Sequence, residues 1–147
     1  MSGETINVWG TQKSLEAAGG AIASGSVVKA TTSYDTVADG LNYPDAEFFL
    51  SGTFSVAPTE GTVLALYARP LALDGASANA EIPEANRPTM FVGSFIVNDV
   101  TTLQNMVLQA RDLPKKADYY IHNSGTGQSF GAGWALKVTP KSYKAAP

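Results

Sequence analysis

The stretch DYYIHNSGTGQSFGAGWALKVT, residues 118–139, decides the fold class of this chain. Its first part, Asp118–His122, is rich in residues that favour β-strands. Its last part, Trp134–Thr139, alternates apolar and polar side chains with the period of a strand that has one buried face. Between them, Asn123–Gly127 has the glycine and asparagine content of a tight turn. The stretch therefore predicts two strands joined by a turn, and we expect Pro140 to end the second one.

Strand patterns of this kind recur along the chain from Ser26 onward, with turn residues between them. We expect strands at Ser26–Tyr34, Ala46–Phe54, Thr62–Ala68, Met90–Val97, Thr101–Ala110, Asp118–His122 and Trp134–Thr139. Thr62–Ala68 is apolar without alternation, which favours a strand buried on both faces. Thr101–Ala110 fits both a helical spacing and a strand alternation, and its strand neighbours favour a strand. Leu71–Pro88 is predicted to be a long irregular loop.

About seven or eight short strands predict an all-β protein built as an antiparallel two-sheet sandwich, with the jelly roll as the expected topology. We expect this sandwich to occupy residues 26–147. Residues 1–25 are small and polar and are interrupted by Gly19, Gly20 and Gly25. They are predicted to form an extended N-terminal arm in which Trp9, Leu15 and Ile22 are thinly spaced apolar anchors.

The composition restricts the kinds of partner. Charged residues make up 16% of the 147 residues, below the usual quarter, and the net charge is −3. Without a cluster of Lys and Arg, we expect no nucleic acid partner. No apolar run approaches the length of a membrane span, so we expect no membrane partner. The chain has no cysteine and Met1–Gly10 lacks the pattern of a secretory signal, so we expect folding in a reducing cytoplasm.

The sequence offers little for catalysis, and we expect no enzyme activity and no cofactor. His122 is the only histidine, and Asp118 precedes it on the same strand at a separation too large for a hydrogen bond. Glu81 and Glu84 lie together in the long loop, but loop carboxylates are usually solvated. Ser124–Gln128 has the glycines of a phosphate cradle but no helix behind them, so a tight turn is expected there.

Two kinds of binding site remain open. One histidine and no cysteine exclude a typical zinc site, and we expect no bound metal, although Asp35, Asp39 and Asp45 leave a calcium site as an alternative. Exposed aromatic side chains are the usual platform for stacking sugars. The candidates for such a platform are Trp9, Trp134, Tyr34, Tyr43, Tyr67, Tyr119 and Tyr120. Strand alternation assigns most of these to the core, so a glycan-binding module stays an alternative.

Four stretches resemble small virion proteins of tailed bacteriophages, of the jelly-roll or sandwich type, including capsid decoration (cement) proteins. These stretches are Tyr43–Phe48, Val63–Pro70 with Leu73–Gly75, Val92–Val97, and Tyr119–Gln128 with Trp134–Pro140. They lie within residues 43–143. None of them is a catalytic motif.

The resemblance implies a virion structural protein that binds the outside of a phage capsid and stabilises it by bridging capsid subunits. The expected partners are the phage major capsid protein and further copies of this chain, as a dimer or trimer. The expected location is the capsid surface, after assembly in the host cytoplasm. From this chain's own residues we predict partner contacts at Trp9, Leu15 and Ile22 in the arm, and at Asn79, Glu81 and Arg87 in the long loop. The alternative is another virion component, such as a tail, neck or fibre domain.

Overall fold

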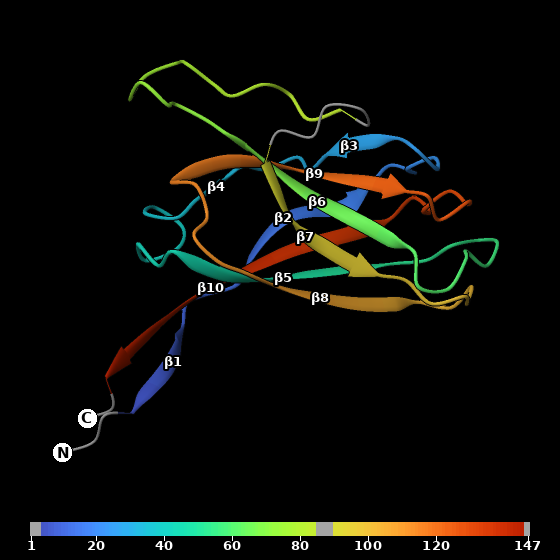
Figure 1. The fold of residues 1–147 in the computed structure, drawn as a ribbon, viewed down its shortest axis with the longest axis horizontal. Helices are drawn as coiled ribbons and strands as arrows, with labels where there is room; N and C mark the ends of the chain where they lie inside the picture. The colour runs from blue at the N-terminus through green and yellow to red at the C-terminus, as the bar shows by residue number, and fades with distance from the viewer. Residues whose placement is uncertain (1–3, 85–89, 146–147) are drawn as a thin grey trace.

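The computed structural model describes residues 4–84 and 90–145, and Figure 1 shows two layers of antiparallel strands. The strands are β1 (Thr5–Trp9), β2 (Lys13–Gly19), β3 (Val27–Lys29), β4 (Tyr34–Asp35), β5 (Asp45–Gly52), β6 (Val63–Pro70), β7 (Met90–Ile96), β8 (Gln104–Ala110), β9 (Lys116–Ser124) and β10 (Trp134–Ala145). This confirms the predicted all-β antiparallel sandwich. The described part of the chain holds no helix with the length and hydrophobicity of a membrane span.

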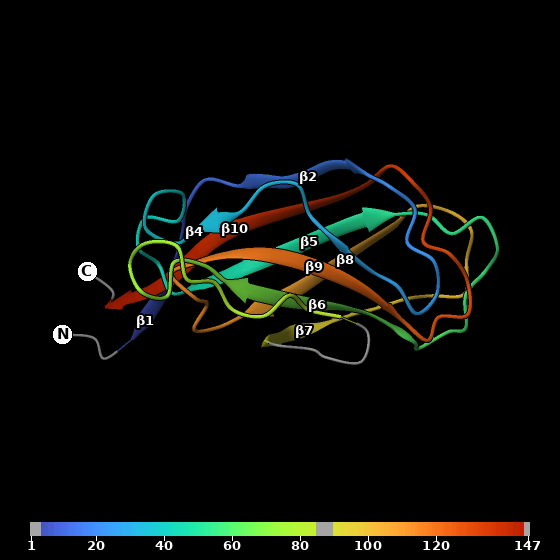
Figure 2. The ribbon, with the colours of Figure 1, turned by 90° about the horizontal axis from the view of Figure 1, so that it is seen from above.

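Each sheet has five strands. In sheet 1, β10 lies between β5 and the pair β1 and β2, and β8 follows β5 at the far edge. In sheet 2, β9 lies between β6 and the pair β3 and β4, and β7 follows β6 at the far edge. The two views of the ribbon agree that the sheets pack face to face (Figures 1 and 2).

The core between the sheets follows the strand alternation in the sequence. Trp134, Leu136 and Val138 of β10 are all fully buried, as predicted. Phe48 and Leu50 of β5 are also fully buried and face the same interior. Burial of a large apolar side chain contributes about 1.5–3 kcal/mol, so this alternation is the main source of fold stability.

β6 is buried on both faces, as its unbroken apolar run predicted. Leu64 and Leu66 belong to the main core, while Ala65 and Tyr67 form a second small cluster with Tyr120 on the outer face of sheet 2. The segment 101–110 fitted both a helix and a strand in the sequence, and in the structure Gln104–Ala110 forms a strand, as predicted. Its register with β5 runs unbroken from Gly52↔Gln104 to Ala46↔Ala110.

The N-terminal segment differs from the predicted extended arm. β2 pairs with β10 in sheet 1, and Ile22 forms a bridge with Phe130. Leu15 and Ile22 are 1% and 0% exposed. Leu15 and Ile22, which were predicted as anchors of a free arm, are therefore part of the core between the sheets.

Two strand regions also differ from the sequence-based prediction. Residues 26–34 form two short strands because Thr32 N–H donates to Leu15 O at 3.0 Å, which draws the chain away from β9. The Leu66/Tyr67 step carries a β-bulge, which turns Phe91 onto the outer face at 58% exposure. β3 and β4 both pair with β9, and β6 and β7 stay paired on either side of the bulge.

β10 continues through Pro140, where it was predicted to end. Pro140 O accepts a hydrogen bond from Gly10 N at 2.8 Å. Because the nitrogen and carbonyl of a strand residue point to the same side, the missing N–H of Pro140 points to the interruption between β1 and β2. No ladder bond is lost there, and the strand runs on to Ala145.

The close approach of Gly19 to Trp134 gives a test of this packing. A Cβ on Gly19 would lie 2.1 Å from the Trp134 ring, whereas a Cβ on Gly20 has nothing within 4 Å. We expect Gly19→Ala to lower the free energy of unfolding by about 1–3 kcal/mol through overpacking. Urea unfolding followed by circular dichroism measures this, with Gly20→Ala as the matched control. Equal stability of the two variants would contradict the packing described.

Candidate interaction surfaces

A two-stranded ribbon extends beyond the sandwich. It is made of β1 and the end of β10, with register Thr5↔Ala145 to Trp9↔Lys141, and we call it the terminal ribbon. Figures 1 and 2 both show it leaving the body on the side where the termini lie. The neighbour of β10 on its other edge, β5, pairs only as far as Lys141. Beyond that residue the ribbon has no third strand in the described part of the chain.

The terminal ribbon exposes apolar side chains on both of its faces. By strand alternation, Trp9 and Tyr143 lie on one face, 48% and 45% exposed, and Ile6 lies on the other, 39% exposed. An isolated two-stranded ribbon is marginally stable in water. Apolar residues on both faces are therefore better suited to contact with another surface than to solvent.

Lys141 connects the ribbon to the body. Its Nζ donates to Gln109 Oε1 at 2.8 Å, and Gln109 Nε2 donates to Glu47 Oε2 at 2.7 Å. The same Nζ lies 5.5 Å from the Trp9 ring centroid and 5.8 Å from that of Tyr143. Cation–π contact with both rings favours the orientation in which they flank the lysine.

The turn at residues 36–42 extends the apolar surface at the root of the ribbon. Leu41, 60% exposed, has a φ of 55°, and its Cδ1 would lie 3.3 Å from a Cβ on Gly10. The turn is tied to β2 by Lys13 Nζ, which contacts Asp39 Oδ2 at 2.6 Å. Burial raises the pKa of Asp39, but hydrogen bonds from Lys13 and the Asp35 N–H outweigh it, so the net pKa is lowered.

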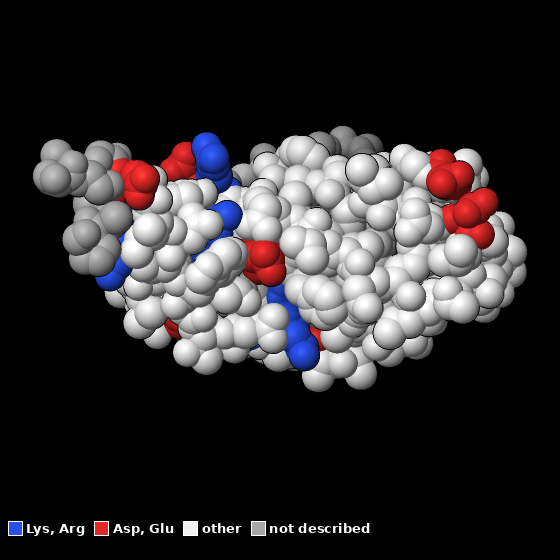
Figure 3. Space-filling model, turned by 90° about the horizontal axis from the view of Figure 1, so that it is seen from below, with Lys and Arg blue, Asp and Glu red and all other residues white. Residues whose placement is uncertain are grey.

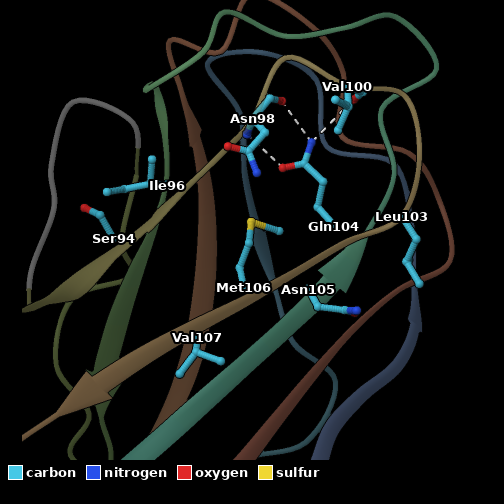
Figure 4. Close-up of a pocket in the computed structure, with 9 residues that line it drawn as sticks. All are labelled: Ser94, Ile96, Asn98, Val100, Leu103, Gln104, Asn105, Met106 and Val107. Carbon is cyan, nitrogen blue, oxygen red and sulfur yellow. Dashed lines mark hydrogen bonds between the residues drawn. The ribbon is translucent and has the colours of Figure 1, made fainter.

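A second exposed apolar surface lies where β7 and β8 form neighbouring edges of the two sheets. It borders a groove of about 550 Å³ between them, drawn in Figure 4. At one end of the groove, the Gln104 side chain is hydrogen-bonded to the backbone of Asn98. Its Oε1 accepts from Asn98 N at 2.9 Å, and its Nε2 donates to Asn98 O at 3.0 Å. The exposed apolar residues around the groove are Ile96, Val100, Leu103 and Val107.

The predicted partner contacts fall in different places. Trp9 is exposed on the terminal ribbon, whereas Leu15 and Ile22 are core residues whose side chains do not reach a partner in this fold. Asn79 and Glu81 are exposed. Asn79 Oδ1 accepts a hydrogen bond from Ala72 N at 3.0 Å, which stabilises the conformation of the loop. Arg87 lies outside the described residues.

Neither the exposure of Tyr143 on a paired strand nor the β7–β8 surface was predicted from the sequence. Tyr143 follows Pro140, which was predicted to end the strand, so its pairing with β1 was not foreseen. The signal for the second surface was present, since residues 90–110 contain one charged residue, Asp99. Low charge alone did not distinguish a core strand from an exposed edge.

The structure places the candidate chemical groups on β9 and in the bend that follows it. His122 is 8% exposed on β9 and stacks on Tyr67 at 6.0 Å between ring centroids, and burial lowers its pKa. Among residues 4–84 and 90–145, no group of three or more His, Cys, Asp or Glu is arranged to hold a metal ion. The predicted turn at Asn123–Gly127 begins later, because Asn123 and Ser124 belong to β9 and the bend lies at residues 125–128. Asn123 Nδ2 donates to Ile22 O and Gln128 O at 2.9 and 2.7 Å and stabilises this bend.

The aromatic residues considered for sugar stacking are mostly inaccessible. Trp134, Tyr34 and Tyr119 are 0% exposed, and Tyr67 and Tyr120 are 8% and 6% exposed. Of the remaining two, Tyr43 is half-buried and Trp9 is exposed on the same face of the terminal ribbon as Tyr143.

No family model, no curated protein and no solved structure matches this chain.

The Lys13–Asp39 pair predicts a pH-dependent contribution to stability. Because the pKa of Asp39 is lowered, its contribution is complete above the ordinary carboxyl value and is lost as the pH falls through the lower folded value. We expect Asp39→Asn to lower the free energy of unfolding at neutral pH by about 1 kcal/mol or less, since the pair is partly exposed. The difference from the parent protein should shrink as the pH falls below the ordinary aspartate pKa of about 4. Urea unfolding at neutral pH and in acid measures it, and a difference that grows in acid would contradict the assignment.

Proposed function

We propose that this protein is a virion structural protein that binds the outer surface of a phage capsid and bridges capsid subunits. The observation that carries the proposal is the terminal ribbon, which presents Trp9 and Tyr143 on one face and Ile6 on the other. A compact sandwich that extends a ribbon with two apolar faces is suited to insertion between neighbouring protein surfaces.

The strand order supports a jelly-roll assignment. With β1 and β2 taken as one strand, and β3 and β4 as another, the sheets read β1/2-β10-β5-β8 and β3/4-β9-β6-β7. In this order each sheet alternates strands from the two ends of the chain, as two interleaved Greek keys do. Jelly rolls are common in viral capsid and lectin domains, so the topology also keeps the glycan-binding alternative.

The surface chemistry supports a protein partner over a charged one. Charged residues are few, and on the face in Figure 3 they lie in small groups with broad uncharged areas between them. Interface cores are depleted in charge and enriched in Tyr and Trp, which matches the terminal ribbon. A binder that attaches to assembled capsid and not to free subunits stabilises the assembly by mass action.

The proposal predicts that the chain bands with phage heads. In a density gradient of a lysate from the natural source, tracked by mass spectrometry, we expect many copies per genome-filled head. Recovery with tails or fibres would instead support another virion component. Recovery at the top of the gradient would contradict the capsid assignment, and fluorescence titration with oligosaccharides would then test the glycan alternative.

The terminal ribbon predicts which side chains matter. We expect Trp9→Ala combined with Tyr143→Ala to weaken binding to heads that lack this protein by roughly 30-fold or more, as loss of a central aromatic contact of about 2 kcal/mol gives. The purified variants are mixed with such heads, and bound copies are counted after sedimentation. Val56→Ala is the control, because Val56 is 56% exposed in a loop outside the ribbon. Full binding by the double variant would remove the ribbon from the interface.

A further inference from the structure

β8 differs from the other edge strands in lacking any protection against pairing. Among the described residues its one ladder partner is β5, so its second edge is open. Exposed edges are normally protected by charged residues, proline, bulges or shortness. β8 is seven residues long, QNMVLQA, with no charge, proline or glycine.

The other edges are shorter, charged or irregular. β1 is uncharged and regular, but it is five residues long against seven for β8. β2 has Lys13 and Glu16, and its ladder with β10 contains register shifts. β3 and β4 are three and two residues long. β7 pairs with β6 through a bulge. Only the β8 edge, within the described ranges, is long, regular and uncharged.

We propose that β8 pairs antiparallel with β8 of a second copy of this chain, about a two-fold axis at Val107. A two-fold interface places the same surface on both sides, so it must be complementary to itself. Centred on Val107, the pairing sets Val107 opposite Val107 of the second copy and Asn105 opposite Gln109 of the second copy. Neither pair brings like charges together, which would be destabilising in directly opposed positions.

The polar pair is complementary as well. Gln109 is held by its bonds to Glu47 and Lys141, which use its carbonyl oxygen and one of its two N–H groups. The second N–H is available to the side-chain oxygen of Asn105 in the second copy, and Asn105 is exposed. The fixed amide reduces the ordering cost of the contact.

The surrounding apolar residues favour the same occupant. Val107 is 54% exposed, and Ile96 and Leu103, beside the groove, are 66% and 62% exposed. A second copy paired along β8 lies next to this groove and provides the matching apolar residues of its own β7–β8 surface. The dimer joins the two copies of sheet 1 into one continuous sheet and leaves both terminal ribbons free for another partner.

The test uses the purified full chain and does not depend on the proposed capsid function. Light scattering after size exclusion should give twice the chain mass of 15.4 kDa. Val107→Lys places two positive charges opposite each other and should raise the dimer dissociation constant by about tenfold or more. Val56→Lys is the matched control, because Val56 is 56% exposed and lies outside the strands. Circular dichroism checks that both variants are folded.

A cross-link makes the test independent of the lysine variant. The chain has no cysteine, so Val107→Cys introduces a single thiol at the two-fold axis. Mild oxidation should give a disulfide-linked dimer with Val107→Cys and little with Val56→Cys. A monomeric or trimeric parent protein, an unchanged dimer in Val107→Lys, or equal cross-linking of the two cysteine variants would each overturn the proposal.

Discussion

The pairing of β10 on both of its edges is the interaction on which the rest of the structure depends. One edge pairs with β5 from Ala135 to Lys141, and the other pairs first with β2 and then with β1. The strand therefore holds the N-terminal segment, the centre of sheet 1 and the terminal ribbon together. Its inward side chains, including the fully buried Trp134, fill the core between the sheets.

The continuation of β10 past the body exposes apolar side chains on a regular element. Within the sandwich, alternation sends one set of side chains into the core. In the terminal ribbon there is no second sheet to cover either face, so Ile6, Trp9 and Tyr143 are all exposed. The same period-two geometry thus supplies core residues in one half of the strand and exposed apolar residues in the other.

The two exposed surfaces are at different places on the fold and suit different partners. The terminal ribbon combines aromatic rings with Lys141 and lies at the end of the body, where both of its faces carry exposed apolar side chains. The β8 edge is uncharged and self-complementary and suits a second copy of the chain. A dimer formed through β8 presents two ribbons, and a protein that bridges subunits benefits from two points of attachment because the second binding event becomes intramolecular.

The sequence by itself determined the fold class and most of the core, since alternation of apolar residues depends only on local strand geometry. Phe48, Leu50, Trp134 and Leu136 were all assigned to buried faces in this way, and the strand at residues 104–110 followed from its neighbours. The glycines Gly125 and Gly127 located the bend after β9, although Asn123 and Ser124 continue the strand.

Only the tertiary structure decided which strand edges and ends stay exposed. Leu15 and Ile22 looked like anchors in a free arm, but pairing of β2 with β10 buries them. Tyr143 lies beyond the predicted end of the last strand, but pairing with β1 makes it part of the ribbon. Exposure of an edge depends on which strand lies beside it, and that partner is distant in sequence, so no local pattern specifies it.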